Sequence, residues 1–160
     1  MIMSSRRLCT LMVVLWIISA AGLGWVFIKG WTAKGSDGRT EIILAPSERD
    51  LVLTQMRQFL QAIQAVLADL GTSDLHQKFQ AGETAARKVG LGMDENIDPA
   101  LLAKIPLAFK QMGMSVHHEF DRLADGIAQG ETAPQIIRRL STITSQCTAC
   151  HEIYRLSPQQ

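Results

Sequence analysis

Residues 145–156 read SQCTACHEIYRL, and this stretch near the end of the chain decides how the rest is interpreted. Cys147 and Cys150 stand three positions apart, and His151 follows directly. This C-x-x-C-H spacing is typical of haem attachment, in which two thiols bind the two vinyl groups and the next residue ligates iron. On a helix the two cysteines differ by about 300° and share nearly one face. The pattern predicts one haem c per chain, held by Cys147 and Cys150, with His151 as the proximal iron ligand.

Two other chemistries also use closely spaced cysteines, and both remain as weaker alternatives. A structural zinc site needs four ligands, and only His117 and His118 could complete one, on an untypical spacing. A thioredoxin-like redox pair stands at a helix N-terminus in a βαβ setting, whereas this pair lies near a predicted helix C-terminus. The third cysteine, Cys9, lies far away in sequence, so the chain is not a disulfide scaffold.

The chain before the motif has the apolar periodicity of helices. Apolar residues recur every three or four positions between capping residues and glycines. They predict helices over about 47–70, 72–90, 106–130 and 132–156, and a short helical turn over 99–105. No strand-like alternation of useful length is present. Four amphipathic helices with short connections predict an all-α, antiparallel four-helix bundle over residues 47–156.

The N-terminal segment has a different composition. Residues 8–28, LCTLMVVLWIISAAGLGWVFI, carry no charge and span about 31 Å as a helix, close to the thickness of a bilayer's hydrocarbon core. Residues 1–29 are therefore predicted to be a signal anchor, a transmembrane helix that stays on the chain. Small residues at 19–21 keep a cleaved signal peptide open as the alternative. Residues 30–46, which show no period, are predicted to be a flexible tether.

Overall charge excludes one class of partner. Charged residues make up 19% of the chain and the net charge is +1. Neither a basic nor an acidic field points to nucleic acid. The predicted partners are therefore the membrane, through the N-terminal helix, and proteins.

The final helix, with CTACHEIYR at 147–155, resembles the cytochrome c-prime family, the class II c-type cytochromes. The resemblance covers roughly residues 47–156 and is specific only in this helix. It implies one covalent haem near the end of a four-helix bundle, and export to the bacterial periplasm with the N-terminus inside. The single-pass protein would then sit in the inner membrane. Homodimers occur among similar proteins, so a homodimer is a further expectation.

The residues after the motif have two readings. The resemblance implies that Tyr154 and Arg155 lie near the haem or its propionates. Alternatively, Tyr154 only packs, and Arg155 only favours the dipole at the helix C-terminus.

The sixth iron position separates two functions. Similar proteins either fill it with methionine, which suits an electron carrier because methionine–histidine ligation raises the haem potential, or leave it empty and bind gases such as nitric oxide. Met56 is the leading candidate for the distal ligand, because it lies on the apolar stripe of its helix at a suitable depth. An open site, with Leu53 or Met56 only packed against the iron, is the alternative, and His117 is a less favoured ligand. Depth along the bundle also admits four residues of lower rank, namely Met93, Met112, Met114 and His118.

These observations together predict a membrane-anchored electron carrier rather than an enzyme. It would transfer one electron at a time between a membrane respiratory complex and a periplasmic redox protein. A gas-binding haem protein is the alternative. A peroxidase-like enzyme is disfavoured, because the sequence does not clearly place a distal histidine and arginine at one site. His117 and Arg122 are the best candidates for such a pair.

Overall fold

A computed structural model describes residues 5–71, 80–90 and 98–157 of the chain. The described elements follow in the order α1 (Ser5–Lys29), β1 (Thr32–Lys34), β2 (Thr40–Ile42), α2 (Pro46–Gly71), α3 (Gln80–Gly90), α4 (Pro99–Lys104), α5 (Leu107–Ala128), α6 (Ala133–Ile153) and β3 (Tyr154–Leu156). Helices dominate this set and the strands are short. The prediction of a helical bundle preceded by one apolar helix is therefore confirmed.

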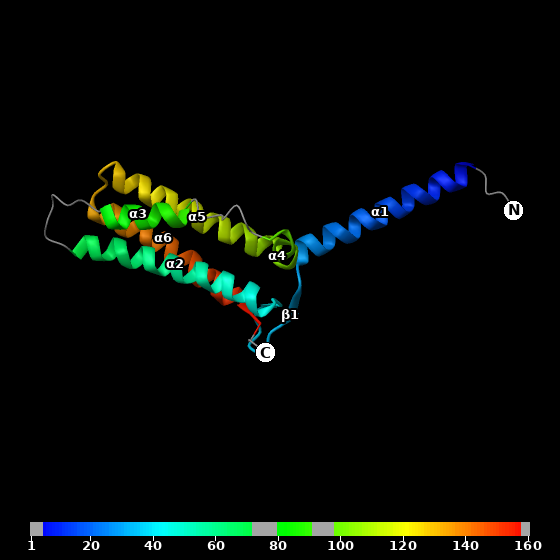
Figure 1. Ribbon diagram of the computed structural model, residues 1–160, viewed down its shortest axis with the longest axis horizontal. Helices are drawn as coiled ribbons and strands as arrows, with labels where there is room; N and C mark the ends of the chain where they lie inside the picture. The colour runs from blue at the N-terminus through cyan, green and yellow to red at the C-terminus, as the bar shows by residue number, and fades with distance from the viewer. Residues whose placement is uncertain (1–4, 72–79, 91–97, 158–160) are drawn as a thin grey trace.

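Four helices form the bundle. Helix α2 packs against α3, α3 against α5, and α5 against α6. Figure 1 shows α2 and α5 running away from the sheet, and α3 and α6 returning toward it. The start of α2, the start of α5 and the end of α6 therefore meet at one end of the bundle, which we call the sheet end.

Most helix bounds match their predictions closely. Helix α4 begins as expected, with Oδ1 of Asp98 accepting a hydrogen bond from the backbone N–H of Ala100 at 2.8 Å. Helix α2 begins at Pro46 rather than Ser47, and Oε2 of Glu48 accepts from the backbone N–H of Ala45. The predicted start of the second helix, at residues 72–79, lies outside the described residues.

The predictions of a flexible tether and of a final helix reaching residue 156 are wrong. Strand β1 pairs antiparallel with β2, and β2 pairs parallel with β3, directly after α6. Helix α6 ends because Tyr154 turns to an extended conformation, with φ −119° and ψ 150°. Residues 30–46 are not a flexible tether because part of the hairpin is buried. Ile42 of β2 is 0% exposed and contributes its side chain to a core. The buried backbone groups beside it need hydrogen-bond partners, and the neighbouring strands supply them.

The buried apolar side chains form two separate cores. The far core fills the half of the bundle away from the sheet, and comprises Ala62, Ile63, Val66, Ala86, Val89, Val116, Phe120, Leu123, Ala124, Ile127, Ile136, Leu140 and Ile143. The sheet-side core joins the sheet to α2 and α4, and comprises Ile42, Leu44, Val52, Leu101 and Ile105. A domain of this size commonly has one contiguous core.

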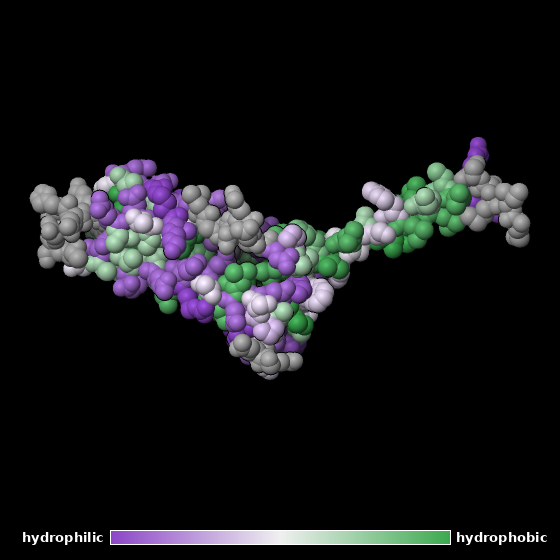
Figure 2. All heavy atoms as spheres, viewed as in Figure 1, coloured by the Kyte–Doolittle hydropathy of each residue, from purple (hydrophilic) through white to green (hydrophobic). Residues whose placement is uncertain are grey.

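Helix α1 leaves the sheet end and points away from the bundle (Figure 1). Its apolar side chains are exposed along its length, and Figure 2 shows this helix as hydrophobic surface beside a mostly hydrophilic bundle. Residues Arg6–Lys29 are long and apolar enough to cross a membrane, as a signal sequence near an N-terminus also is.

Candidate functional site

A hollow separates the two cores on the side of the C-x-x-C-H motif. Its larger part has a volume of about 460 Å³ and lies between α2, α5 and α6. Phe59 and Ile63 border it from the far core, and Val52 borders it from the sheet-side core. A smaller part, of about 170 Å³, continues toward the sheet. Sites for cofactors commonly measure roughly 300–1,000 Å³ and are lined mainly by apolar side chains.

The motif lines this hollow from α6. Cys147 and Cys150 are half-buried there, while His151 is exposed and borders both parts of the hollow. Burial raises the pKa of both thiols, so each is a neutral thiol at neutral pH. The helix thus brings two thiols and one imidazole to a single apolar space, as the three-residue spacing predicts.

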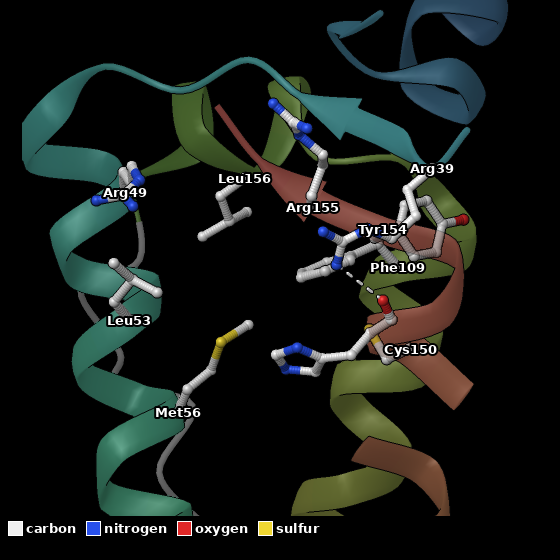
Figure 3. A pocket seen from close by; sticks show the side chains of 10 residues that line it. Arg39, Arg49, Leu53, Met56, Phe109, Cys150, Tyr154, Arg155 and Leu156 are labelled. Carbon is white, nitrogen blue, oxygen red and sulfur yellow. Dashed lines mark hydrogen bonds between the residues drawn. The ribbon is translucent and has the colours of Figure 1, made fainter. Parts of the chain in front are cut away.

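The opposite wall of the hollow belongs to α2. Leu53 and Met56 both line the two parts, one helical turn apart. Figure 3 shows Met56 reaching from α2 into the space, toward the side on which Cys150 lies. The two candidates for the distal position therefore face the same space as His151.

His117 borders the deeper end of the hollow from α5. His117 is 9% exposed, and Nδ1 of its ring lies 2.5 Å from the carbonyl oxygen of Val89 on α3. Because a carbonyl oxygen only accepts, Nδ1 of His117 donates this hydrogen bond. The ring also contacts the edge of Phe59, at 4.9 Å between centroids. This hydrogen bond and this packing give His117 a structural role that does not depend on iron.

Arginines stand at the sheet end of the hollow. Arg49 lines it from the first turn of α2, and its Nε is buried without a hydrogen-bond partner among the described residues. Arg39 of the hairpin donates from Nη1 to the carbonyl oxygen of His151, at 3.0 Å (Figure 3, dashed line). That carbonyl is in the last turn of α6, where carbonyls lack a partner within the helix. Arg39 therefore caps the helix that carries the motif.

The two residues after the motif have divided roles. Tyr154 lines the smaller part of the hollow and packs edge-on against Phe109, at 5.4 Å between ring centroids. Burial raises the pKa of its hydroxyl. Arg155 also lines the hollow, but its guanidinium already has two carboxylate partners, Glu41 at 3.2 Å and Asp37 at 3.5 Å.

The structure does not bring the other candidates to this space. Met114, His118 and Arg122 line a different hollow on the other face of α5, and His118 is exposed. His117 and Arg122 therefore face different spaces. Half-buried Met112 lines neither hollow among those described. Met93 lies outside the described residues.

The residues of this site fit a haem better than either alternative. The hollow offers apolar walls, two thiols, an accessible imidazole and a buried arginine nitrogen that still needs an acceptor, such as a propionate. Within the described residues, no three His, Cys, Asp or Glu side chains cluster as metal ligands, and a structural zinc site needs four ligands. The raised thiol pKa values oppose a reactive redox pair, which needs a stabilised thiolate.

Sequence reasoning missed Arg39, Arg49 and Phe109 as residues that line the site. Arg49 stands four positions before Leu53 and seven before Met56, so helical spacing could have placed it on the same face. Arg39 had no such signal, because residues 30–46 show no period and its hydrogen-bond partner, the carbonyl of His151, lies 112 positions later in the chain.

The comparisons with known proteins add no relative. No protein-family model matches the chain, and neither the curated proteins nor the solved structures searched contain a match. The functional argument therefore depends on the motif and the hollow that it faces.

Proposed function

We propose that this chain is a membrane-anchored, c-type electron carrier with one haem bound covalently through Cys147 and Cys150. The observation that carries the proposal is the hollow between the two cores, which receives two thiols and the imidazole of His151 from one helix. The bound group would supply a one-electron couple, ferric to ferrous iron. Each thiol S–H would add across one vinyl group, forming a C–S bond while the hydrogen passes to the adjacent carbon.

The chain's own residues would then bind, orient and shield the group. His151 would hold the proximal iron position, and Arg39 would fix its helix turn through the backbone carbonyl. Arg49 would take a carboxylate of the group at its unpaired Nε. Phe59 and Phe109 would exclude water from opposite ends of the hollow, which helps to set the potential.

The anchor and the compartment follow from the same proposal. Helix α1 is long and apolar enough to hold the protein in a membrane. Covalent haem attachment, implied by the resemblance to the cytochrome c-prime family, would place the bundle in the bacterial periplasm. Its partners would be redox proteins of the membrane or the periplasm.

Met56 is proposed as the sixth ligand. It shares the hollow with His151 and stands on the opposite wall. Leu53, one turn away on the same wall, supports the alternative in which the sixth position stays open for a small gas.

The absorption spectrum of the purified full-length protein tests this proposal. We expect a low-spin ferric spectrum with the weak long-wavelength band of methionine ligation, and a reversible one-electron titration. Rapid binding of carbon monoxide by the ferrous protein would instead establish the open site and replace the carrier by a gas-binding protein. Lack of any covalent haem would overturn both.

Met56→Leu tests the ligand itself. We expect this variant to lose the methionine band and to shift to a high-spin spectrum with a lower potential. Met114→Leu is the matched control, because Met114 lines a different hollow on α5. If both variants keep the native spectrum, Met56 is not the ligand.

A further inference from the structure

The junction between α1 and the bundle is a fixed structure. Gly30 adopts φ +63° directly after α1, and the backbone N–H of Trp31 donates to the carbonyl oxygen of Lys104 at 2.7 Å. A Cβ on Gly30 would lie 2.6 Å from the backbone nitrogen of Pro106, so only glycine fits this turn. The chain leaves the apolar helix in one direction, held by α4.

Helix α5 also touches the end of α1. Nζ of Lys110 lies 3.8 Å from the ring centroid of Phe27, and donates to the carbonyl oxygens of Leu102 at 2.9 Å and of Phe27 at 3.5 Å. Phe27 belongs to the last turn of the apolar span, where helix carbonyls lack partners. The sheet end of the bundle is therefore level with the end of this span.

One face of the hairpin at this end is apolar and exposed. Trp31 and Ile43 are opposite each other across the hairpin, joined by a 2.9 Å backbone hydrogen bond, and are 54% and 45% exposed. Ala33 is exposed on the same face by strand alternation. We call these three residues the outer sheet face. The next residue, Ile42, is completely buried on the opposite face.

The charges around the outer sheet face suit a lipid surface. Lys29 is exposed two positions before Trp31, at the end of α1, whereas Lys34 lies on the opposite face of β1 by strand alternation. Glu41, the acidic residue on this side of the strands, is neutralised by Arg155 at 3.2 Å. Tryptophan beside a lysine is a composition found at the level of lipid headgroups, and a lysine there attracts anionic lipids.

We propose that the outer sheet face rests on the surface of an anionic phospholipid bilayer and seats the bundle there. The occupant is lipid because the face continues directly from a helix that itself suits a membrane. The inference rests on the membrane anchoring in the proposed function. This contact with the bilayer holds the hollow and its motif close to the membrane. The electron partner therefore meets the protein at the membrane surface, without movement of the bundle on a flexible tether.

Tryptophan reporters in the full-length protein test the contact. The three native tryptophans are first removed by Trp16→Phe, Trp25→Phe and Trp31→Phe. Ile43→Trp then reports on the outer sheet face, and Ile137→Trp is the matched control, since Ile137 is similarly exposed at the start of α6. Each protein is placed in nanodiscs of phosphatidylcholine and phosphatidylglycerol, with or without bromine on the upper acyl chain.

We expect brominated lipid to lower the Ile43→Trp fluorescence about twofold, because an interfacial side chain lies within reach of the upper acyl chain, and to leave the control unchanged. A chain that enters nanodiscs but shows no quenching at position 43 overturns the seating and leaves the anchor intact. Equal quenching at both positions also overturns it, because the bundle would then lie flat. A chain that does not enter nanodiscs overturns the anchor as well.

Discussion

The two cores of the bundle are built differently. In the far core, Phe120, Leu123, Ile136 and Ile143 are all 0% exposed. The sheet-side core is small, and the side chain of Ile42 from the hairpin is needed to exclude water from it. Between them, the same helices enclose a hollow of about 460 Å³.

The difference lies in the side chains that each half of the helices offers. On α5, the far half presents Val116 and Phe120 to the interior, whereas Gly113 borders the hollow with no side chain at all. Protein interiors are normally packed as densely as organic crystals. Thiols and an imidazole around an apolar hollow therefore support the proposal that a bound group completes this half of the core.

The largest expected effect comes from removing the thiols. Cys147→Ser combined with Cys150→Ser should abolish covalent haem, because no sulfur remains to bond it. Without a group joining the two cores, we also expect thermal unfolding to change from one transition to two. Acid-acetone extraction measures the first effect and calorimetry the second. Cys9→Ser, far along α1, is the control and should retain haem. Covalent haem in the double variant would refute the attachment.

Alanine substitutions of two phenylalanines, one in the far core and one beside the hollow, compare how much each region contributes to the free energy of unfolding. Phe120→Ala should reduce the free energy of unfolding by about 3–5 kcal/mol, because it leaves a cavity in a filled core. Phe109→Ala should cost about 1–2 kcal/mol in the haem-free protein, because its half-buried ring already borders the hollow. Chemical denaturation of both variants in the Cys147→Ser, Cys150→Ser background measures this. Equal losses would mean that the hollow closes when haem is absent.

The far core and the motif could be predicted from the sequence because both depend on local spacing. Ile136, Leu140 and Ile143 follow the helical period, and all three are buried in the far core. Cys147, Cys150 and His151 share a face for the same reason, and the structure has them at one hollow.

The sheet end could not be predicted, because it depends on contacts between distant residues. The hairpin strands have three residues each, too few for alternation to be recognised, and β2 gains its second partner only when α6 returns. Tyr154 continued the apolar stripe of α6, but strand pairing overrides that stripe. The sequence alone therefore could not show that Arg39 reaches His151.

Alanine substitutions of two glycines compare the packing beside the hollow with the packing between α2 and α3, and their expected effects on stability are smaller. Gly113→Ala should raise the stability of the haem-free protein by about 0.5–1 kcal/mol, because alanine favours a helix and nothing lies within 4 Å of the added Cβ. Gly82→Ala is the matched substitution in α3, where the added Cβ would lie 2.9 Å from Cα of Val66, so we expect destabilisation. Denaturation midpoints measure both. A loss of stability in Gly113→Ala would mean that the wall of the hollow is already packed.

The smallest effect concerns how the hairpin holds the end of α6. Arg39 binds Asp37 through Nε and Nη2, at 2.9 and 2.7 Å, and this lowers the pKa of Asp37 from 3.8 to about 2. Because the pKa is lower in the folded state, the stabilisation is complete above about pH 3.8 and is lost as the pH falls through about 2. Asp37→Asn lacks it at every pH, so Arg39 should cap His151 less tightly. We therefore expect the melting temperatures of the native chain and Asp37→Asn to differ slightly at pH 5 and to converge toward pH 2. Curves that stay parallel would show that the charge of Asp37 does not help Arg39 to hold the motif helix.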